Sequence, residues 1–214
     1  MVDSLLTLPG SAPAPTALYC HTRSLHAALQ GWWLESGLFG GMLDQQAYRN
    51  ILTRLHRCFS MLEHELTSRH AGLLDDIGYL PRLSLLDADL AELGVERTFH
   101  KQLWPCPLPD RPAALGALYV IEGAAQAGQH MLSQLMLYPF GAVACRYFVA
   151  YGDETNRHWL RFCNLLREEL DSPSALVQSA LYAEAVFRLF LDPWRPLPAA
   201  RQAAGGCTDA ACPG

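Results

Sequence analysis

The sequence has a single lysine, Lys101, among its 16 basic residues, so arginine carries almost all of the fixed positive charge. The formal net charge is −5 at pH 7. Proteins that bind a phosphate backbone usually concentrate positive charge on one face, which argues against nucleic acid as a partner. An anionic group on a small ligand is instead expected to meet an arginine, whose planar guanidinium pairs well with a carboxylate.

The sequence also lacks a disulfide framework. Its seven cysteines are an odd number without paired spacing, and the N-terminus shows no signal-peptide pattern. We therefore expect a reducing cytoplasm. Cys207 and Cys212 lie in a tail rich in glycine and alanine that is predicted to be flexible.

No uninterrupted apolar run of membrane length is present. Residues 113–137 exceed the roughly 20 residues that a membrane helix needs, but Glu122, His130, glycines and glutamines interrupt them. We interpret this segment as a buried helix of a soluble fold, with no membrane partner.

Several motifs of well-known sites are missing. No Glu-x-x-His, His-Glu-x-x-His, Cys-x-x-Cys or Gly-x-Ser-x-Gly occurs, and there is no glycine-rich phosphate loop. Their absence argues against a carboxylate-bridged di-iron bundle, a zinc protease helix, a dithiol redox site, a serine-hydrolase elbow and a nucleotide-phosphate site.

The apolar residues recur at helical spacing, and no strand alternation or internal repeat is visible. The predicted fold is all-α, with one helical domain over 15–195 between flexible segments 1–14 and 196–214. The segment 104–115 is predicted to be a shaped proline-rich loop, and 142–152 is ambiguous. Helices are expected over 16–37 ending at Gly37, over 44–70 with Asp44 as cap, over 82–94 closed by Gly94, over 153–170, and over 172–193 with Ser172 as cap.

Two features carry possible chemistry. His26 lies on the apolar face of the first helix, and a buried imidazole there needs a hydrogen-bond partner or a metal. His21 and His130 meet the same argument, so spacing does not choose among the three. Gly123 and Gly128 leave a helix bare on two neighbouring faces, which suits either a flat ligand or tight helix packing.

Four segments occur in an order that resembles the bacterial haem oxygenase family, especially its members that accompany bacteriophytochromes. They are TRSLH at 22–26, RLSLLDADLAELG at 82–94, LGALYVIEGAAQAGQ at 115–129 and YGDETNRHWLRFCNLL at 151–166. The resemblance implies an all-α fold with haem between a proximal helix and a kinked, glycine-containing distal helix.

The resemblance also implies roles for single residues. His26, four residues after Thr22, matches the proximal iron ligand, and both residues are expected at the haem. Tyr119 falls where a tyrosine can approach a haem propionate. Arg157 and Arg161 are further candidates for the propionates, because carboxylates suit arginine.

On the distal side, Gly123 and Gly128 match the glycines over which oxygen reacts. Ala127 stands where the family has a further glycine. Its methyl group is expected to decide whether the site catalyses the reaction or only binds haem.

Other positions depart from the family or stay open. Ala124 stands where the animal enzymes have an aspartate, so proton delivery is expected to use ordered water, with Gln126 and Gln129 as candidates. Leu18 and Tyr19 stand where a basic residue usually precedes the proximal histidine.

The implied activity is haem oxygenase, which cleaves haem to biliverdin, carbon monoxide and ferrous iron with O₂ and external electrons. Haem is then both substrate and cofactor, a ferredoxin or reductase is the electron donor, and a bacteriophytochrome is a candidate receiver of biliverdin. Two alternatives remain: a non-catalytic haem-binding or haem-sensing protein altered at Ala127, and a protein of the same fold that takes no haem.

Overall fold

Helices form the regular structure throughout the described residues, which are 13–95 and 106–191 of this computed structural model. Within these ranges no strand is present, so the predicted all-α fold is confirmed. Nearly all of the two segments expected to be flexible lies outside the described residues, and so do Cys207 and Cys212.

The two long N-terminal helices begin and end where the sequence indicates. Helix α1 (Ala14–Glu35) stops before Gly37, which has a φ of 83° that favours glycine. Helix α2 (Gln45–Arg69) starts after Asp44, whose carboxylate accepts a 2.7 Å hydrogen bond from the amide of Ala47.

The next helices are shorter. Helix α3 (Ala71–Ile77) was not predicted, because seven residues are too few to show a helical period. Helix α4 (Arg82–Glu92) ends before Gly94 as predicted, with a φ of 70° at that glycine.

The ambiguous segment contains helix rather than strand. Helices α6 (Pro139–Val143) and α7 (Arg146–Val149) are each about one turn long. The buried carboxylate of Asp89 accepts hydrogen bonds from the amides of Arg146 and Tyr147 at 3.0 and 2.9 Å. It therefore joins the start of α7 to α4.

Three further elements complete the chain. The 3₁₀ turn η1 (Gly152–Glu154) leads into α8 (Thr155–Glu169). Helix α9 (Pro173–Leu191) follows Ser172, whose hydroxyl accepts a 3.2 Å hydrogen bond from Ala175, as the predicted cap requires. By length and composition alone α9 could cross a membrane, but it packs against α1 and α5 as part of the bundle.

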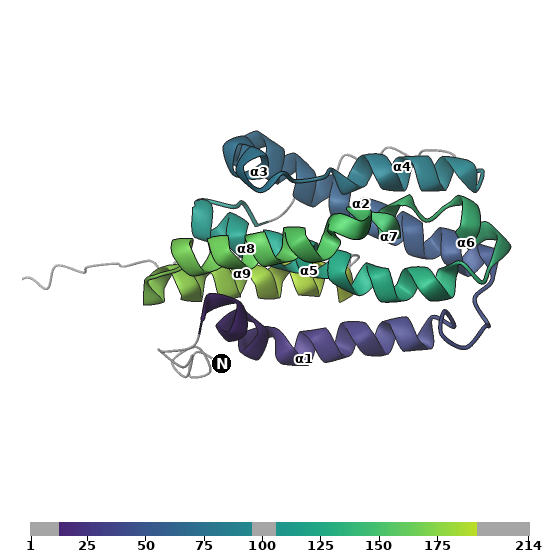
Figure 1. The fold of residues 1–214 in the computed structure, drawn as a ribbon, viewed down its shortest axis with the longest axis horizontal. Helices are drawn as coiled ribbons and strands as arrows, with labels where there is room; N and C mark the ends of the chain where they lie inside the picture. Colours follow the sequence, from purple (N-terminus) through teal and green to yellow (C-terminus); the bar gives the residue numbers. More distant parts are fainter. Residues whose placement is uncertain (1–12, 96–105, 192–214) are drawn as a thin grey trace, which may run out of the picture.

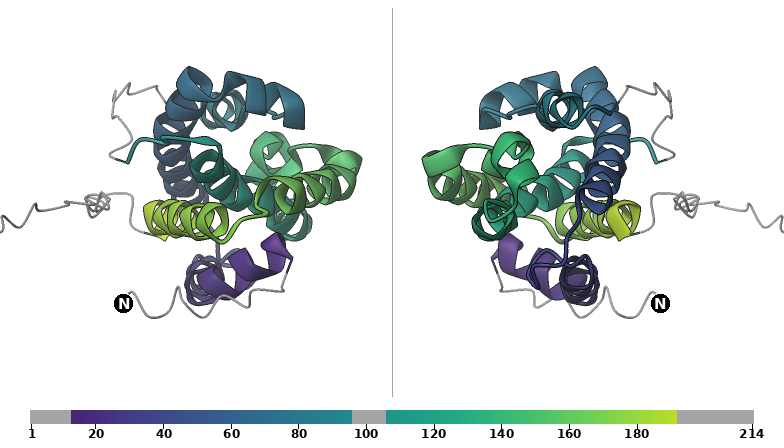
Figure 2. Two further views of the ribbon diagram at one scale, coloured as in Figure 1. Left: turned by 90° about the vertical axis from the view of Figure 1, so that its left-hand side faces the viewer. Right: turned by 90° about the vertical axis from the view of Figure 1, so that its right-hand side faces the viewer.

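Helix α5 (Arg111–Leu135) runs without a break through the middle of the molecule. Figure 1 shows three layers, with α1 on one face, α5, α8 and α9 in the middle, and α2, α3 and α4 on the other face. The two views of Figure 2 agree with this arrangement. In these layers α5 lies between α1 and α2, so opposite faces of α5 point toward different helices.

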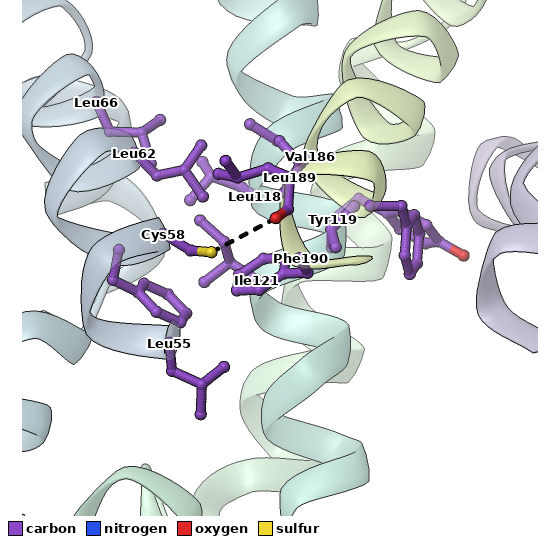
Figure 3. Packing of buried hydrophobic residues seen from close by; sticks show 14 of the residues in the cluster. Leu55, Cys58, Leu62, Leu66, Leu118, Tyr119, Ile121, Val186, Leu189 and Phe190 are labelled. Atoms are coloured by element: carbon purple, nitrogen blue, oxygen red, sulfur yellow. Dashed lines mark hydrogen bonds between the residues drawn. The ribbon is translucent and has the colours of Figure 1, made fainter. Parts of the chain in front are cut away.

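The core lies where α2, α5 and α9 meet (Figure 3). Cys58 is fully buried there, and its thiol donates to the Leu189 carbonyl oxygen at 3.6 Å. Burial raises the pKa of Cys58 to about 12, so this thiol is chemically inert at neutral pH.

Candidate active site

A cavity of about 560 Å³ lies between α1 and α5, closed by parts of α2, α7 and α9. Its volume falls within the roughly 300–1,000 Å³ that small-molecule sites occupy. Most of the wall is aromatic, aliphatic or backbone. The residues of the wall that bear on function are His26, Trp32, Arg54, Gly123, Ala124, Ala127, Gly128, His130 and Phe187.

His26 faces this cavity from α1. Its ring packs on Phe187 with a centroid separation of 4.4 Å and on Tyr19 at 5.3 Å. Burial lowers the pKa of the imidazole, which favours the neutral form. A neutral imidazole is the form that binds a metal, so His26 is suited to ligate an iron that enters with its own cofactor.

No three metal-binding side chains gather anywhere in residues 13–95 and 106–191. One histidine ligand from α1, His26, on an apolar cavity matches a cofactor that supplies its metal's remaining ligands, as a porphyrin does.

Small residues of α5 face His26 across the cavity. Gly123, Ala124 and Ala127 all lie on the wall, and Ala127 is on its exposed part. A Cβ on Gly123 would meet only the Trp159 ring, at 3.8 Å, which is ordinary contact. These small side chains leave room for a flat group against α5, as the resemblance implies for the distal helix.

Gly128 has a different reason to be glycine. A Cβ there would lie 3.3 Å from the carbonyl oxygen of Phe148, so its bare side faces α7. The expectation that both glycines turn their bare sides to a ligand needs correction here. Gly128 lines the cavity, but its missing side chain permits tight packing of α5 on α7.

Together these observations fit haem. The cavity is apolar, it presents one neutral imidazole from α1, and its opposite wall consists of small side chains. A flat aromatic macrocycle needs such walls, and its iron needs such a ligand.

The structure places Tyr119 and Thr22 behind His26, not on the cavity wall. The Tyr119 side chain leaves the core toward α1 (Figure 3), and its hydroxyl lies 3.5 Å from Nε2 of His26. The buried Thr22 hydroxyl donates to the Leu18 carbonyl oxygen of its own helix at 2.7 Å. The expected contact of Tyr119 with a propionate is thus replaced by a contact with the candidate ligand.

The two arginines predicted for the propionates lie elsewhere. Arg157 is 71% exposed and pairs with Glu154 at 2.8 Å on the surface of α8. Arg161 borders a second, more polar pocket next to α3. Neither residue lines the cavity, because the face of α8 that carries them turns away from α1 and α5. Their assignment as propionate partners stays a prediction, and no contact in this structure supports it.

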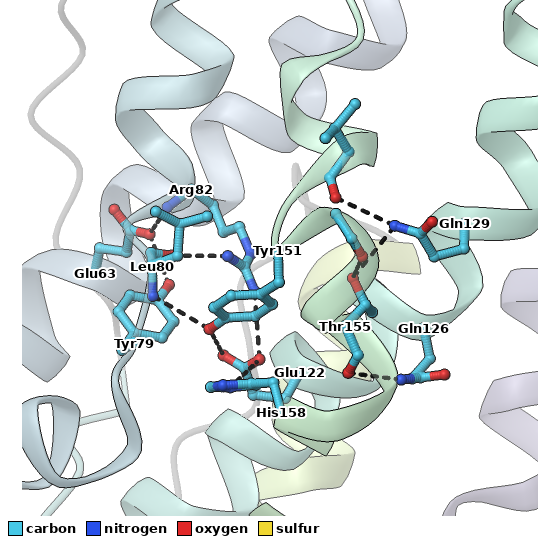
Figure 4. A network of polar contacts seen from close by, with 12 residues as sticks. Glu63, Tyr79, Leu80, Arg82, Glu122, Gln126, Gln129, Tyr151, Thr155 and His158 are labelled. Atoms are coloured by element: carbon cyan, nitrogen blue, oxygen red, sulfur yellow. Dashed lines mark hydrogen bonds and ion pairs between the residues drawn. The ribbon is translucent and has the colours of Figure 1, made fainter. Parts of the chain in front are cut away.

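Gln126 and Gln129 also point away from the cavity, toward the start of α8 (Figure 4). The Gln126 amide donates to the Thr155 carbonyl oxygen at 3.0 Å, and the Gln129 amide donates to the Val149 carbonyl oxygen at 3.1 Å. These bonds hold α5 against the α7–α8 connection. They give neither residue a geometry for delivering protons to the cavity.

A buried polar cluster on the far side of α5 was not predicted (Figure 4). The fully buried Glu122 carboxylate accepts from Arg82 at 3.3 Å and from the Tyr151 hydroxyl at 3.2 Å, and it lies 3.0 Å from Nε2 of His158. The Arg82 guanidinium also lies over the Tyr151 ring at 4.6 Å. The cluster fixes α5 relative to α4 and α8, one residue away from Gly123.

The structure distinguishes the other two histidine candidates, His21 and His130, by their position relative to the cavity. His21 pairs with Glu184 of α9 at 3.2 Å and does not line the cavity. His130 does line it, from α5, at an exposed position.

A residue that sequence reasoning missed is Arg54, which reaches the wall from α2. The signal in the sequence that could have found Arg54 was a charged residue beside the apolar residues of α2.

Comparison with known proteins gives two matches and one negative result. No protein-family model matches the chain. A haem oxygenase from Xanthomonas campestris pv. campestris is 29% identical over 153 residues, which cover 70% of this chain and 90% of that protein. The solved NO- and CO-bound haem oxygenase from Neisseria meningitidis superposes with a TM-score of 0.70 at 21% identity, covering 92% of this chain and 98% of that one.

The structural match shows the fold, and the sequence match extends over nearly the whole length of a named relative. The structural match agrees with the all-α layers described above. The chain is similar to haem oxygenases, at 29% identity to one in sequence and with a TM-score of 0.70 to another in fold.

Proposed function

We propose that this protein is a haem oxygenase that binds haem in the cavity between α1 and α5, with His26 as the residue that would ligate the iron. The observation that carries the proposal is the imidazole of His26, whose pKa is lowered by burial, facing a small-residue wall across an apolar cavity of about 560 Å³. The haem oxygenases from Xanthomonas and Neisseria support it by sequence and fold.

When bound, haem supplies both the iron that reacts with O₂ and the ring that is opened to biliverdin, carbon monoxide and ferrous iron. The protein's part is to bind, orient and shield. His26 would hold the iron from α1, and the small side chains of Gly123, Ala124 and Ala127 would leave room for the ring against α5. Phe187 and the other apolar residues of the wall exclude bulk water.

Electrons come from outside the chain in this proposal, because the sequence has no flavin or nicotinamide motif. A ferredoxin or a reductase is the proposed donor, in a cytoplasm that keeps the cysteines reduced. A bacteriophytochrome is a proposed receiver of biliverdin.

The first test is binding. Haemin is titrated into the wild type and into His26→Ala, His21→Ala and His130→Ala, with the Soret band as readout. We expect a saturable Soret band that is lost or strongly shifted only in His26→Ala. Absence of saturable binding by the wild type would overturn the proposal.

The second test is turnover. Ascorbate is added in air to the wild-type haem complex. We expect the Soret band to be replaced by the spectrum of biliverdin. A haem complex that stays unchanged would instead identify a haem-binding protein without this activity.

A further inference from the structure

The Tyr119 hydroxyl lies 3.5 Å from Nε2 of His26, the residue proposed to ligate the haem iron. The tyrosine comes from α5 and is 5% exposed, and its ring meets the imidazole edge-on, with 6.3 Å between the centroids and 79° between the planes. Tyr119 does not line the cavity. Nε2 is therefore within hydrogen-bond distance of a buried hydroxyl that lies outside the cavity wall.

Neighbouring side chains fix both partners of this contact. The Tyr119 ring packs on Trp159 of α8 with 6.0 Å between centroids, and the His26 ring packs on Phe187 of α9 with 4.4 Å. The buried hydroxyl of Thr22, one turn before His26, donates its single proton to a carbonyl oxygen of its own helix at 2.7 Å. Packing from α8 and α9 thus holds the tyrosine hydroxyl and the imidazole together.

The chemistry of Nε2 makes this contact a competitor of iron. A neutral imidazole has one N–H and one lone pair, and a hydroxyl can bond to either because it both donates and accepts. Iron needs the lone pair of a ring nitrogen. Nε2 is the nitrogen at the tip of the side chain, away from the α1 backbone, where a macrocycle meets the least steric conflict. In neither tautomer can Nε2 bond to the Tyr119 hydroxyl and to iron at once.

We propose that Tyr119 holds Nε2 of His26 and has to release it before iron binds there, so that Tyr119 is a positioning residue that weakens and slows haem binding. The inference rests on the proposed function, since the competitor is haem iron. Its sign is opposite to that of a tyrosine that binds a propionate, because removal of the hydroxyl should strengthen haem binding.

The experiment titrates haemin into the wild type, Tyr119→Phe and Tyr48→Phe, with the Soret band as readout of affinity and stopped-flow mixing as readout of the association rate. Tyr48 is the matched control: it is also buried, its hydroxyl donates to the carbonyl oxygen of Ala144, and it does not line the cavity. Before haemin is added, ¹⁵N NMR spectra of the three histidine-labelled proteins report the hydrogen bond at Nε2 of His26.

We expect Tyr119→Phe to bind haemin about three- to tenfold more tightly than the wild type, and faster, which is the effect expected from loss of one competing hydrogen bond. The Nε2 resonance of His26 should move in Tyr119→Phe and keep its wild-type position in Tyr48→Phe. Tyr48→Phe should bind haemin like the wild type.

The inference is overturned if Tyr119→Phe binds haemin only as tightly as the wild type or more weakly, or if its Nε2 resonance does not move. It falls together with the proposed function if the wild type does not bind haemin at all. If Tyr119→Phe does not fold, as judged by circular dichroism, the wild-type spectrum decides, because an Nε2 resonance without a hydrogen bond overturns the inference and a hydrogen-bonded one supports it.

Discussion

Glycines on α5 serve two different contacts. Gly116 lies where α5 crosses α9, and a Cβ there would overlap the carbonyl group of Ser179, whose carbon is 2.8 Å away. Gly123 has only the Trp159 ring near the same position. Gly116 therefore maintains the bundle, whereas Gly123 belongs to the candidate site.

Gly116→Ala should destabilise the protein by about 2–3 kcal/mol, because the methyl group has to push α9 away from α5. Gly31→Ala on α1 is the control, since no atom lies within 4 Å of its Cβ position. That change should stabilise the helix by up to about 1 kcal/mol. Urea unfolding measures both, and equal stabilities for the two variants would contradict this description of the crossing.

Ala127 is the one position of the distal wall where this chain has a methyl group in place of the expected glycine. Ala127→Gly should raise the rate of ascorbate-driven biliverdin formation, because the α5 backbone can then lie closer to the haem. It should also cost about 1 kcal/mol of stability from lower helix propensity. A single-turnover rate unchanged from wild type would show that the methyl group does not limit the reaction.

At the scale of helices, the cavity depends on how α5 is held from behind. Glu122 and Arg82 are both almost completely buried, and they join α5 to α4 and α8 through Tyr151 and His158. Burying this pair requires that each charge compensate the other. The pair therefore constrains the position of the distal wall as well as the fold.

Glu122→Gln should lower the free energy of unfolding by about 3 kcal/mol, because it leaves the Arg82 charge buried without its carboxylate. Glu154→Gln removes a carboxylate from the exposed pair with Arg157 and should cost less than about 1 kcal/mol. Thermal or urea unfolding compares them. A Glu122→Gln protein as stable as the Glu154→Gln control would contradict the structural role of the buried pair.

The contact of α1 with α9 should depend on pH. The hydrogen bond from His21, together with Arg188, lowers the pKa of Glu184 from 4.5 to about 2. A carboxyl whose pKa is depressed on folding adds stability above its unfolded pKa and loses it as the pH falls toward the folded value. This contribution should be complete above pH 4.5 and should disappear toward pH 2.

Glu184→Gln tests this window. With allowance for the 27% exposure of the side chain, we expect the wild type to exceed the variant by about 2 kcal/mol at pH 6, and the difference to shrink by pH 3. Urea unfolding at several pH values measures it. A difference that stays constant from pH 6 to pH 3 would rule out the ion pair as its source.

Across the whole molecule, local sequence patterns predicted where the helices begin and end better than they predicted which helices pack against each other. Amphipathic periods and caps at Asp44 and Ser172 gave the long helices, since both signals lie within a few residues of the helix they define. The apolar face of its helix made His26 a candidate alongside His21 and His130, and only the resemblance to the haem oxygenases selected it.

The remaining features depend on tertiary contacts. Arg82 and Glu122 are 40 residues apart in sequence, and no local pattern pairs them. A helical period does not reveal which face of α8 turns toward α5, so the sequence could not show that Arg157 and Arg161 lie off the cavity wall. Arg54 was missed for the same reason, since only the assembled bundle brings it to the cavity.

The central claim is that His26 holds haem in this cavity for its own oxidative cleavage, and imidazole rescue tests it most directly. His26→Ala with one equivalent of haemin is given ascorbate in air, with and without added imidazole. We expect no biliverdin without imidazole and a return of biliverdin formation with it. Wild-type biliverdin formation by His26→Ala without imidazole would contradict it.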